Sequence, residues 1–251
     1  MKKIQSLKLN FSERAYLYLK FLIFKTSKNL PEAKKYLNWQ NMERDPLSDC
    51  MACEKDKIIR FYKDLNNHKE TKVRFEKLLK SEQKCKSVPM CTYSSFLIYL
   101  IELKDFSTAQ EYYEKIKIEI MKNPRFLFEQ SEIISYLVMV DELKKALKYF
   151  EKQFPIAMAC TSILDKHTYY IAAELLFKKI KQTSPKKVIH LKLQKNEFLF
   201  KNGNLWDLNE IINFFETKNI DIALKFDKRN QNSKFTENYK RLQELAGVLA
   251  K

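Results

Sequence analysis

The sequence predicts an all-α fold built from antiparallel helix pairs, and three observations support this prediction. Only two glycines and six prolines occur among 251 residues, which leaves little material for the tight turns of a many-stranded sheet. Runs of Leu, Lys, Glu, Ile and Ala suit helices. The third observation is an internal repeat with a period of 37 to 38 residues, and periods in this range are typical of stacked supersecondary units.

The repeat is clearest where YLIELKDFSTAQEYYEKIK (99–117) aligns without a gap with YLVMVDELKKALKYFEKQF (136–154), at an offset of 37 residues. Each unit carries a small residue at the same place, and these residues are Ala33, Thr71, Ala109 and Ala146. We therefore expect a repeat array over 1–181, with a basic helical C-terminal region over 182–251. The expected units are 12–47, 48–88, 89–125, 126–160 and a shortened unit at 161–181.

Each full unit is expected to contain a first helix, a short polar turn and a second helix. The expected first helices are 16–24, 58–65, 96–103 and 133–140. The small residue of the second helix marks the place where the two helices approach closely. Asp105, and Asp141 or its neighbours, are positioned to cap second helices. One pair cannot bury its apolar face alone, so neighbouring pairs are expected to share a core.

The register of the repeat breaks after Phe154. AAELLFKKIK (172–181) is again similar to the second-helix sequence AQEYYEKIK, so we expect either a shortened pair or a capping element here. Beyond it we expect a helix over 185–200 and another over 207–217, the latter opened by an Asp207–Glu210 capping pattern. A polar segment, 227–238, is expected to precede a final helix over 239–249.

The formal charge of +16 is concentrated at the two ends of the chain. Residues 1–28 hold seven Lys and Arg against one acid, and residues 181–251 hold fourteen against eight. Such a field favours nucleic acid, an acidic protein or an anionic membrane as a partner. The run 178–195 holds seven lysines and no acid, and it is either a phosphate-contacting surface or a solvated helix face. The candidate anion-binding residues are Lys178, Lys179, Lys181, Lys186, Lys187, Lys192, Lys195, Lys228 and Arg229.

No run of apolar residues is long enough for a transmembrane helix, so we expect a soluble protein. The three histidines, His68, His167 and His190, are scattered, and no phosphate loop, nucleophile elbow or dinucleotide fingerprint is present. We therefore expect no enzyme activity, no cofactor and no small-molecule substrate.

The five cysteines indicate a reducing compartment and free thiols, because the number is odd. Cys50 and Cys53 have the spacing of half a zinc site, but Cys85 and Cys91 are too far apart in sequence to complete it. Cys53 and Cys91 are 38 residues apart, which places them in adjacent units, roughly 8–10 Å from one another. Semi-buried thiols at the starts of first helices are therefore favoured over structural zinc.

The segment CTYSSFLIYLIELKDFSTAQEYYEKIK (91–117) resembles a pentatricopeptide repeat, with a Thr-Tyr opening and an Ala-x-x-aromatic-aromatic-Glu second helix. It is also similar to the related tetratricopeptide repeat, whose period is about 34 residues. The resemblance covers roughly 12–154. It implies a right-handed α-solenoid in which Ser94, and residues 129–131 of the next unit, face RNA.

The resemblance further implies a non-enzymatic protein that binds RNA within an organellar ribonucleoprotein or a translation or RNA-maturation assembly, similar to fungal mitochondrial gene-expression factors. The alternative is a tetratricopeptide-like scaffold that holds a protein partner in its groove. Residues 1–28 are rich in Lys and poor in acids, which is the charge character of a mitochondrial transit peptide. A matrix location is expected, with the nucleus or cytoplasm as the alternative.

Overall fold

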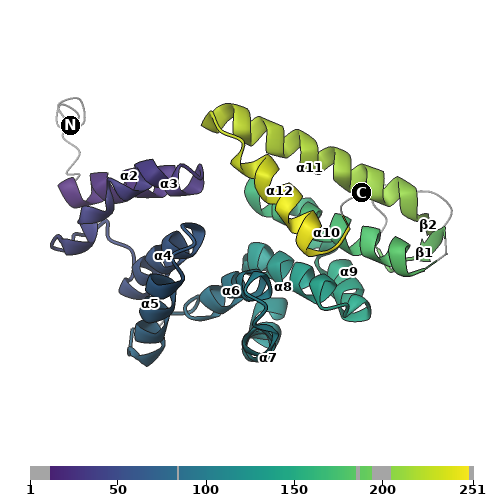
Figure 1. The fold of residues 1–251 in the computed structure, drawn as a ribbon, viewed down its shortest axis with the longest axis horizontal. Helices are drawn as coiled ribbons and strands as arrows, with labels where there is room; N and C mark the ends of the chain where they lie inside the picture. Colours follow the sequence, from purple (N-terminus) through teal and green to yellow (C-terminus); the bar gives the residue numbers. More distant parts are fainter. Residues whose placement is uncertain (1–11, 84, 185–186, 194–204, 249–251) are drawn as a thin grey trace. The chain divides into compact units, whose positions relative to one another are not determined.

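The computed structural model describes residues 12–83, 85–184, 187–193 and 205–248. These residues are mostly helical, which confirms the expected all-α class, and they include one small two-stranded sheet. The chain divides between Pro89 and Met90 into two compact units, shown in Figure 1.

The first unit contains two helix pairs. Its elements are α2 (Glu13–Thr26), α3 (Leu30–Lys34), the 3₁₀ helix η1 (Leu37–Asn41), α4 (Met51–Asp64) and α5 (His68–Lys80). The core is largely aromatic, because Tyr18 and Phe21 from α2 pack with Trp39 and with Phe61 from α4. The second helix of the first pair is short and is followed by the 3₁₀ turn.

The second unit begins with two more helix pairs and continues into a C-terminal region. Its elements are α6 (Met90–Glu102), α7 (Phe106–Lys122), η2 (Pro124–Phe126), α8 (Leu127–Met139), α9 (Leu143–Ala159), α10 (Ile163–Thr183), β1 (Val188–His190), β2 (Leu205–Asp207), α11 (Leu208–Asn230) and α12 (Lys234–Leu245). Helices pack in a chain of neighbours: α6 contacts α7 and α8, α8 contacts α9 and α10, and α10 contacts α11 (Figure 1). Every residue from Tyr169 to Phe177 is buried, because α10 is covered by α8 and α11.

The four helix pairs share one turn. The residue that leaves the first helix has a positive φ in every case: 62° at Lys28, 55° at Asn66, 59° at Lys104 and 59° at Asp141. The next backbone N–H bonds to a carbonyl five residues earlier, at 2.8–3.0 Å, as in a Schellman motif. The positive-φ residues of these turns are 38, 38 and 37 residues apart.

The small residues expected at the helix contacts are all fully buried: Ala33, Thr71, Ala109 and Ala146 have no exposed surface. Second helices are capped as the sequence suggests, since the Asp105 carboxylate accepts a hydrogen bond of 3.1 Å from the Thr108 N–H. Asn29 and Asn67 do the same in the first unit. In the fourth pair the N-cap is Glu142, which makes no side-chain cap bond.

The C-terminal region differs from the prediction in three places. Residues 188–190 form a strand that pairs antiparallel with 205–207, so the helix expected over 185–200 is wrong at these described residues; β-branched Val188 and Ile189 suit the extended backbone. Asp207 caps α11 as expected, but α11 and α12 extend through most of the polar segment 227–238. Finally, 161–181 is not a shortened pair but most of one long helix, α10.

No helix in the described part of the chain is both long enough and apolar enough to cross a bilayer.

Candidate functional site

A basic pocket of about 540 Å³ opens on the second unit, between α7, α9 and the segment that follows β1. Such a volume lies within the usual range for ligand sites. The side chains around it are Lys117, Ile118, Met121, Lys122, Lys148, Tyr149, Glu151, Lys152 and Lys192. Five lysines against one glutamate give the lining a strong positive charge.

Hydrogen bonds between α7 and α9 fix the floor of the basic pocket. The Met121 carbonyl, at the end of α7, accepts bonds of 3.2 Å from the Lys152 ammonium and from the Gln153 amide of α9. Gln153 is buried, so this contact is shielded from water. Lys148 and Lys152 lie one helical turn apart and therefore share a face of α9.

The strand β1 brings Lys192 to the rim of the basic pocket. Ile189 pairs with Trp206 in the two-stranded sheet, and the neighbouring Leu191 is buried. The backbone N–H of Lys192 donates a 2.7 Å hydrogen bond to the Glu151 carboxylate of α9. That bond uses the one acidic group of the lining to hold the backbone and leaves the Lys192 ammonium at the rim.

Several of these lysines lack an acidic neighbour. The Lys117 ammonium pairs with Glu114 and lies 5.7 Å from the centre of the Tyr113 ring. By contrast, among the described residues no carboxylate lies within ion-pair distance of the other four lysines: Lys122, Lys148, Lys152 and Lys192. Unneutralised ammonium groups around one concave surface raise the local positive potential.

The basic pocket also has an apolar side. Ile118 is 56% exposed, and the Tyr149 ring is half-buried beside the lysines. Burial raises the pKa of Tyr113, and the neighbouring Tyr149 side chain raises it further. Aromatic rings among basic side chains are a common feature of surfaces that bind single-stranded nucleic acid without sequence preference.

Two lysines of the basic run 178–195 form ion pairs within the protein. The Lys178 ammonium lies 2.8 Å from the carboxylates of both Glu174 and Glu216. Burial lowers the pKa of Lys178, but its hydrogen bonds to these carboxylates outweigh that effect and raise it above the ordinary value. Lys179 contacts Asp141 and the Ala246 carbonyl, both at 3.3 Å. These two residues are therefore engaged within the fold.

The remaining predicted basic residues are dispersed. Lys181 and Lys187 are exposed, as are Lys228 and Arg229 near the end of α11. The Arg229 guanidinium lies over the Phe226 ring at 4.9 Å. Lys186 and Lys195 lie outside the described residues. Of the predicted residues, only Lys192 lines the basic pocket.

Ser94 does not face solvent, which corrects the role that the repeat resemblance implied for it. It is fully buried in α6, between α7 and α8, and its hydroxyl donates a 2.9 Å hydrogen bond to Glu132. Ser131, in the corresponding part of α8, is also fully buried and bonds to the Leu127 carbonyl. The first helices of the second unit are covered by neighbouring helices, so polar side chains at these positions bond to groups inside the protein.

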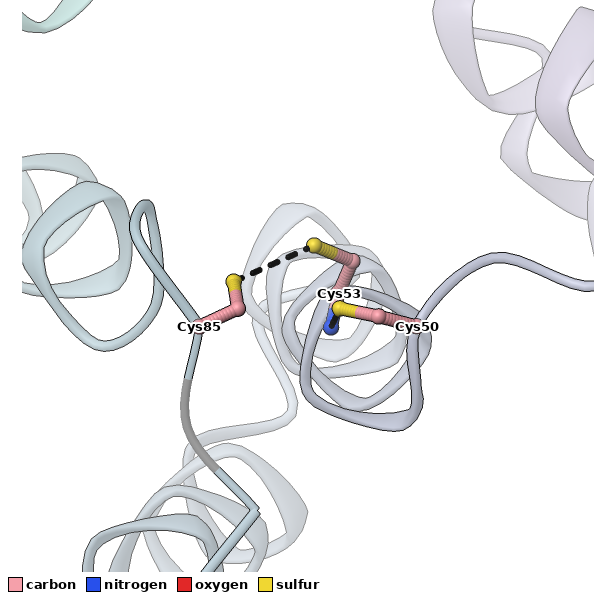
Figure 2. Close-up of side chains that lie close together, drawn as sticks. All are labelled: Cys50, Cys53 and Cys85. Carbon is pink, nitrogen blue, oxygen red and sulfur yellow. Dashed lines mark hydrogen bonds between the residues drawn. The ribbon is translucent and has the colours of Figure 1, made fainter.

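A second cluster, in the first unit, consists of three thiols. The Sγ atoms of Cys50, Cys53 and Cys85 all lie within 4.8 Å of one another (Figure 2). Cys50 is the N-cap of α4, and its sulfur accepts a 3.3 Å hydrogen bond from the Cys53 N–H. Cys85 approaches from the loop after α5, with its sulfur 3.6 Å from that of Cys53.

The protein environment shifts the pKa values of two of these thiols, Cys53 and Cys85, in opposite directions. Burial raises the pKa of Cys53, and the two neighbouring sulfurs raise it further. Burial also raises the pKa of Cys85, but the Ser87 and Val88 N–H groups and the Cys53 and Cys50 thiols together outweigh that effect, so the net shift is downward. The sequence places Cys53 and Cys91 at equivalent positions of adjacent units, whereas the structure brings Cys85 to Cys53. Cys91 is buried in α6, and Cys160 follows α9.

Sequence reasoning missed most of the basic pocket. Lys148 and Lys152 have the spacing of one helical face, and this spacing was the available signal. Their meeting with Lys117 and Lys122 of α7 depends on how two helices pack, which residue types alone do not reveal.

No family model, no curated protein and no solved structure matches this chain.

Proposed function

We propose that this protein is a non-enzymatic helical-repeat protein that binds single-stranded RNA, and that the basic pocket between α7 and α9 is a contact site for the RNA backbone. The observation that carries the proposal is the lining itself: five lysines converge, and four of them have no carboxylate partner among the described residues. Lysines of this kind bind phosphates and release condensed counterions.

The repeat supports an α-solenoid as the architecture behind this function. Four helix pairs share one turn at intervals of 37 and 38 residues, and α6, α8 and α10 pack in sequence order. In a solenoid each unit contacts its neighbours only, and the second helices form a continuous face. On that face, α7 and α9 contribute the lysines of the basic pocket.

The chemistry of the pocket favours RNA in single-stranded form. Ammonium groups neutralise the backbone, while the half-buried Tyr149 ring offers a surface on which a base stacks. Neither contact reads a sequence. We therefore expect binding with little sequence preference and a strong dependence on salt.

A salt titration of binding to labelled single-stranded RNA, followed by fluorescence anisotropy, tests the proposal. The double variant Lys148→Glu with Lys152→Glu is expected to weaken binding at least tenfold and to reduce the salt slope by about 1.4, since each lost phosphate contact accounts for roughly 0.7 on a single strand. The matched control is Lys225→Glu with Lys240→Glu, which makes the same charge change at exposed positions of α11 and α12.

Equal losses in the two double variants would show that overall charge, rather than the basic pocket, determines binding. Undetectable binding of the unaltered protein at low salt would remove the RNA proposal altogether. Helical circular dichroism of each variant verifies that the fold is intact.

A protein-binding scaffold is the second candidate, and a separate observation favours it. Ile220 and Leu224 lie one turn apart on α11 and are 45% and 56% exposed, so they form an apolar contact surface outside the basic pocket. If RNA binding is absent, Ile220→Asp with Leu224→Asp becomes the variant expected to lose the partner.

We also propose a mitochondrial matrix location within an organellar ribonucleoprotein or translation assembly, on the charge of residues 1–28. Residues 1–11 of that segment lie outside the described part, but Tyr18 and Phe21 belong to the core. Removal of a leader must therefore stop before Ser12, which caps α2. Mass spectrometry of the mature N-terminus tests this: a cleavage site inside α2 would contradict it, and an intact Met1 would favour the nucleus or cytoplasm.

A further inference from the structure

Three of the five cysteines converge at one place in the first unit, and this convergence is independent of the RNA proposal. Cys50 and Cys53 come from the start of α4, whereas Cys85 lies 32 residues beyond Cys53, after α5. Their sulfurs lie within 4.8 Å of one another. From this geometry we infer that Cys50, Cys53 and Cys85 together bind one Zn²⁺ ion.

The spacing of the sulfurs suits tetrahedral zinc. A Zn–S bond of about 2.3 Å places two sulfurs of a tetrahedron roughly 3.8 Å apart. The Cys53 and Cys85 sulfurs are 3.6 Å apart, and the Cys50 sulfur lies within 4.8 Å of both. A disulfide between Cys53 and Cys85 would use two of these thiols and leave Cys50 without a role.

Backbone N–H groups point at two of the three sulfurs. Cys53 donates to the Cys50 sulfur and Val88 donates to the Cys85 sulfur, each at 3.3 Å. Hydrogen bonds from N–H groups favour a thiolate over a thiol, and thiolates are the form that binds metal. Cys50 and Cys53 also lie at the N-terminus of a 14-residue helix, where the helix dipole stabilises negative charge.

The loop that carries Cys85 is held against α4 by the protein itself. The Cys85 N–H bonds to the Val88 carbonyl at 3.1 Å, which closes a turn around the cysteine. The Gln83 amide donates to the Met51 sulfur at 3.6 Å. These contacts place the third ligand beside the first two, so the ion meets a largely preformed site.

Binding replaces three S–H protons by one Zn²⁺ ion and forms three Zn–S bonds, with no change in oxidation state. Water occupies the fourth position, because Cys50 is exposed and leaves the ion open to solvent. The ion connects the start of α4 to the loop after α5 and thereby stabilises the first unit.

Titration of the full-length, reduced protein with Co²⁺ as a spectroscopic substitute for Zn²⁺ tests the inference. We expect one Co²⁺ per chain, with thiolate charge-transfer bands and the intense visible bands of tetrahedral cobalt, all displaced by Zn²⁺. Cys50→Ser, Cys53→Ser and Cys85→Ser should each weaken binding at least tenfold. Cys160→Ser is the matched control, since Cys160 is a partly exposed thiol outside the cluster, and it should bind as the unaltered protein does.

A second measurement needs no variant. Alkylation of the native chain with and without Zn²⁺, followed by peptide mass spectrometry, should show Cys50, Cys53 and Cys85 protected together and Cys160 unprotected. The inference is overturned if the reduced protein binds no Co²⁺, if Cys85→Ser binds it as tightly as the unaltered chain, if Cys160→Ser loses as much affinity as Cys53→Ser, or if Zn²⁺ protects none of the three thiols.

Discussion

Each unit buries carboxylates, and Glu54 and Glu174 show two different ways of stabilising them. In the first unit Glu54, 6% exposed, accepts hydrogen bonds of 2.8 and 2.9 Å from the Arg14 guanidinium and one of 2.5 Å from Arg44. In the second unit Glu174, fully buried, accepts mainly from neutral groups: the Tyr239 hydroxyl and the Asn219 and Gln243 amides.

This difference shows that a lysine-rich sequence does not reveal which lysines are neutralised inside the fold. Glu174 also takes one charged partner, Lys178, from the basic run that the sequence offers as an anion-binding surface. A buried charge needs partners inside the fold, so part of the positive charge of the sequence is neutralised there. The charges available to a ligand are those, such as Lys148 and Lys192, that have no internal acid.

Removal of Glu174 should cause the largest loss of stability. Glu174→Ala leaves the Tyr239 hydroxyl and the Asn219 and Gln243 amides without their shared acceptor in buried surroundings, and we expect a loss of about 5 kcal/mol in the free energy of unfolding. Urea denaturation measures it, and hydrogen exchange should show the loss in α10–α12. Glu216→Ala, which removes the more exposed partner of Lys178, should cost less than about 1 kcal/mol. Equal losses of stability in Glu174→Ala and Glu216→Ala would contradict the greater importance of the buried carboxylate.

Loss of Arg14 should be the next most damaging change. Arg14→Met removes one of the two guanidinium groups around Glu54, but Arg44 remains, so we expect a loss of about 3 to 4 kcal/mol. Hydrogen exchange in α2 and α4 reports it. Lys35→Met, which breaks the exposed pair with Glu32, is the control and should leave exchange unchanged. A similar response to both substitutions would mean that burial of the ion pair does not matter.

His167 should make the second unit sensitive to acid. Burial lowers its pKa to about 4, below the value of about 6.5 in an unfolded chain. The unfolded state therefore takes up the proton first, and the stability that neutral His167 provides is lost as pH falls from about 6.5 towards 4. We expect His167→Gln to remove about 2 kcal/mol of the stability difference between pH 7 and pH 5. His190→Gln, in the exposed strand β1, should retain the full pH dependence of the free energy of unfolding. If it weakened that dependence as much as His167→Gln does, His167 would not be the source of the effect.

The smallest effect concerns the repeated turn. Lys104 is exposed and has a φ of 59°, a conformation that costs a side chain about 1 kcal/mol or more and glycine much less. Lys104→Gly should raise the free energy of unfolding by up to about 1 kcal/mol. The same change at Lys225, inside α11, should lower it by about 1 kcal/mol. If Lys104→Gly lowered the free energy of unfolding, the left-handed backbone at this position would not be a source of strain.

The sequence predicts the helix pairs well because their signals are local. A small residue at Ala109 or Ala146 and a polar cap at Asp105 act within a few residues of the turn, and all three lie where the repeat places them. The cap expected at Asp141 or its neighbours lies at Glu142, which makes no side-chain cap bond. Asp141 itself adopts the left-handed conformation and pairs with Lys179. A positive φ at a lysine or aspartate leaves no mark in the residue pattern.

The remaining differences depend on contacts between distant segments. AAELLFKKIK resembles a second helix, yet α10 packs against α8, as a first helix would, and its burial follows from that position. Cys85 lies beside Cys53 because of where the loop after α5 runs, which the spacing of cysteines does not determine. The same applies to Lys192, which reaches α9 only through the strand β1.

Ultraviolet crosslinking of single-stranded RNA to the full-length protein, with peptide mapping of the crosslinked residues, tests most directly whether the second helices carry the RNA surface. We expect crosslinks in peptides of α7 and α9, above all at Tyr149, and their loss in the Lys148→Glu, Lys152→Glu double variant. Crosslinks confined to α11 and α12 around Lys228 and Arg229, unchanged in that variant, would contradict it.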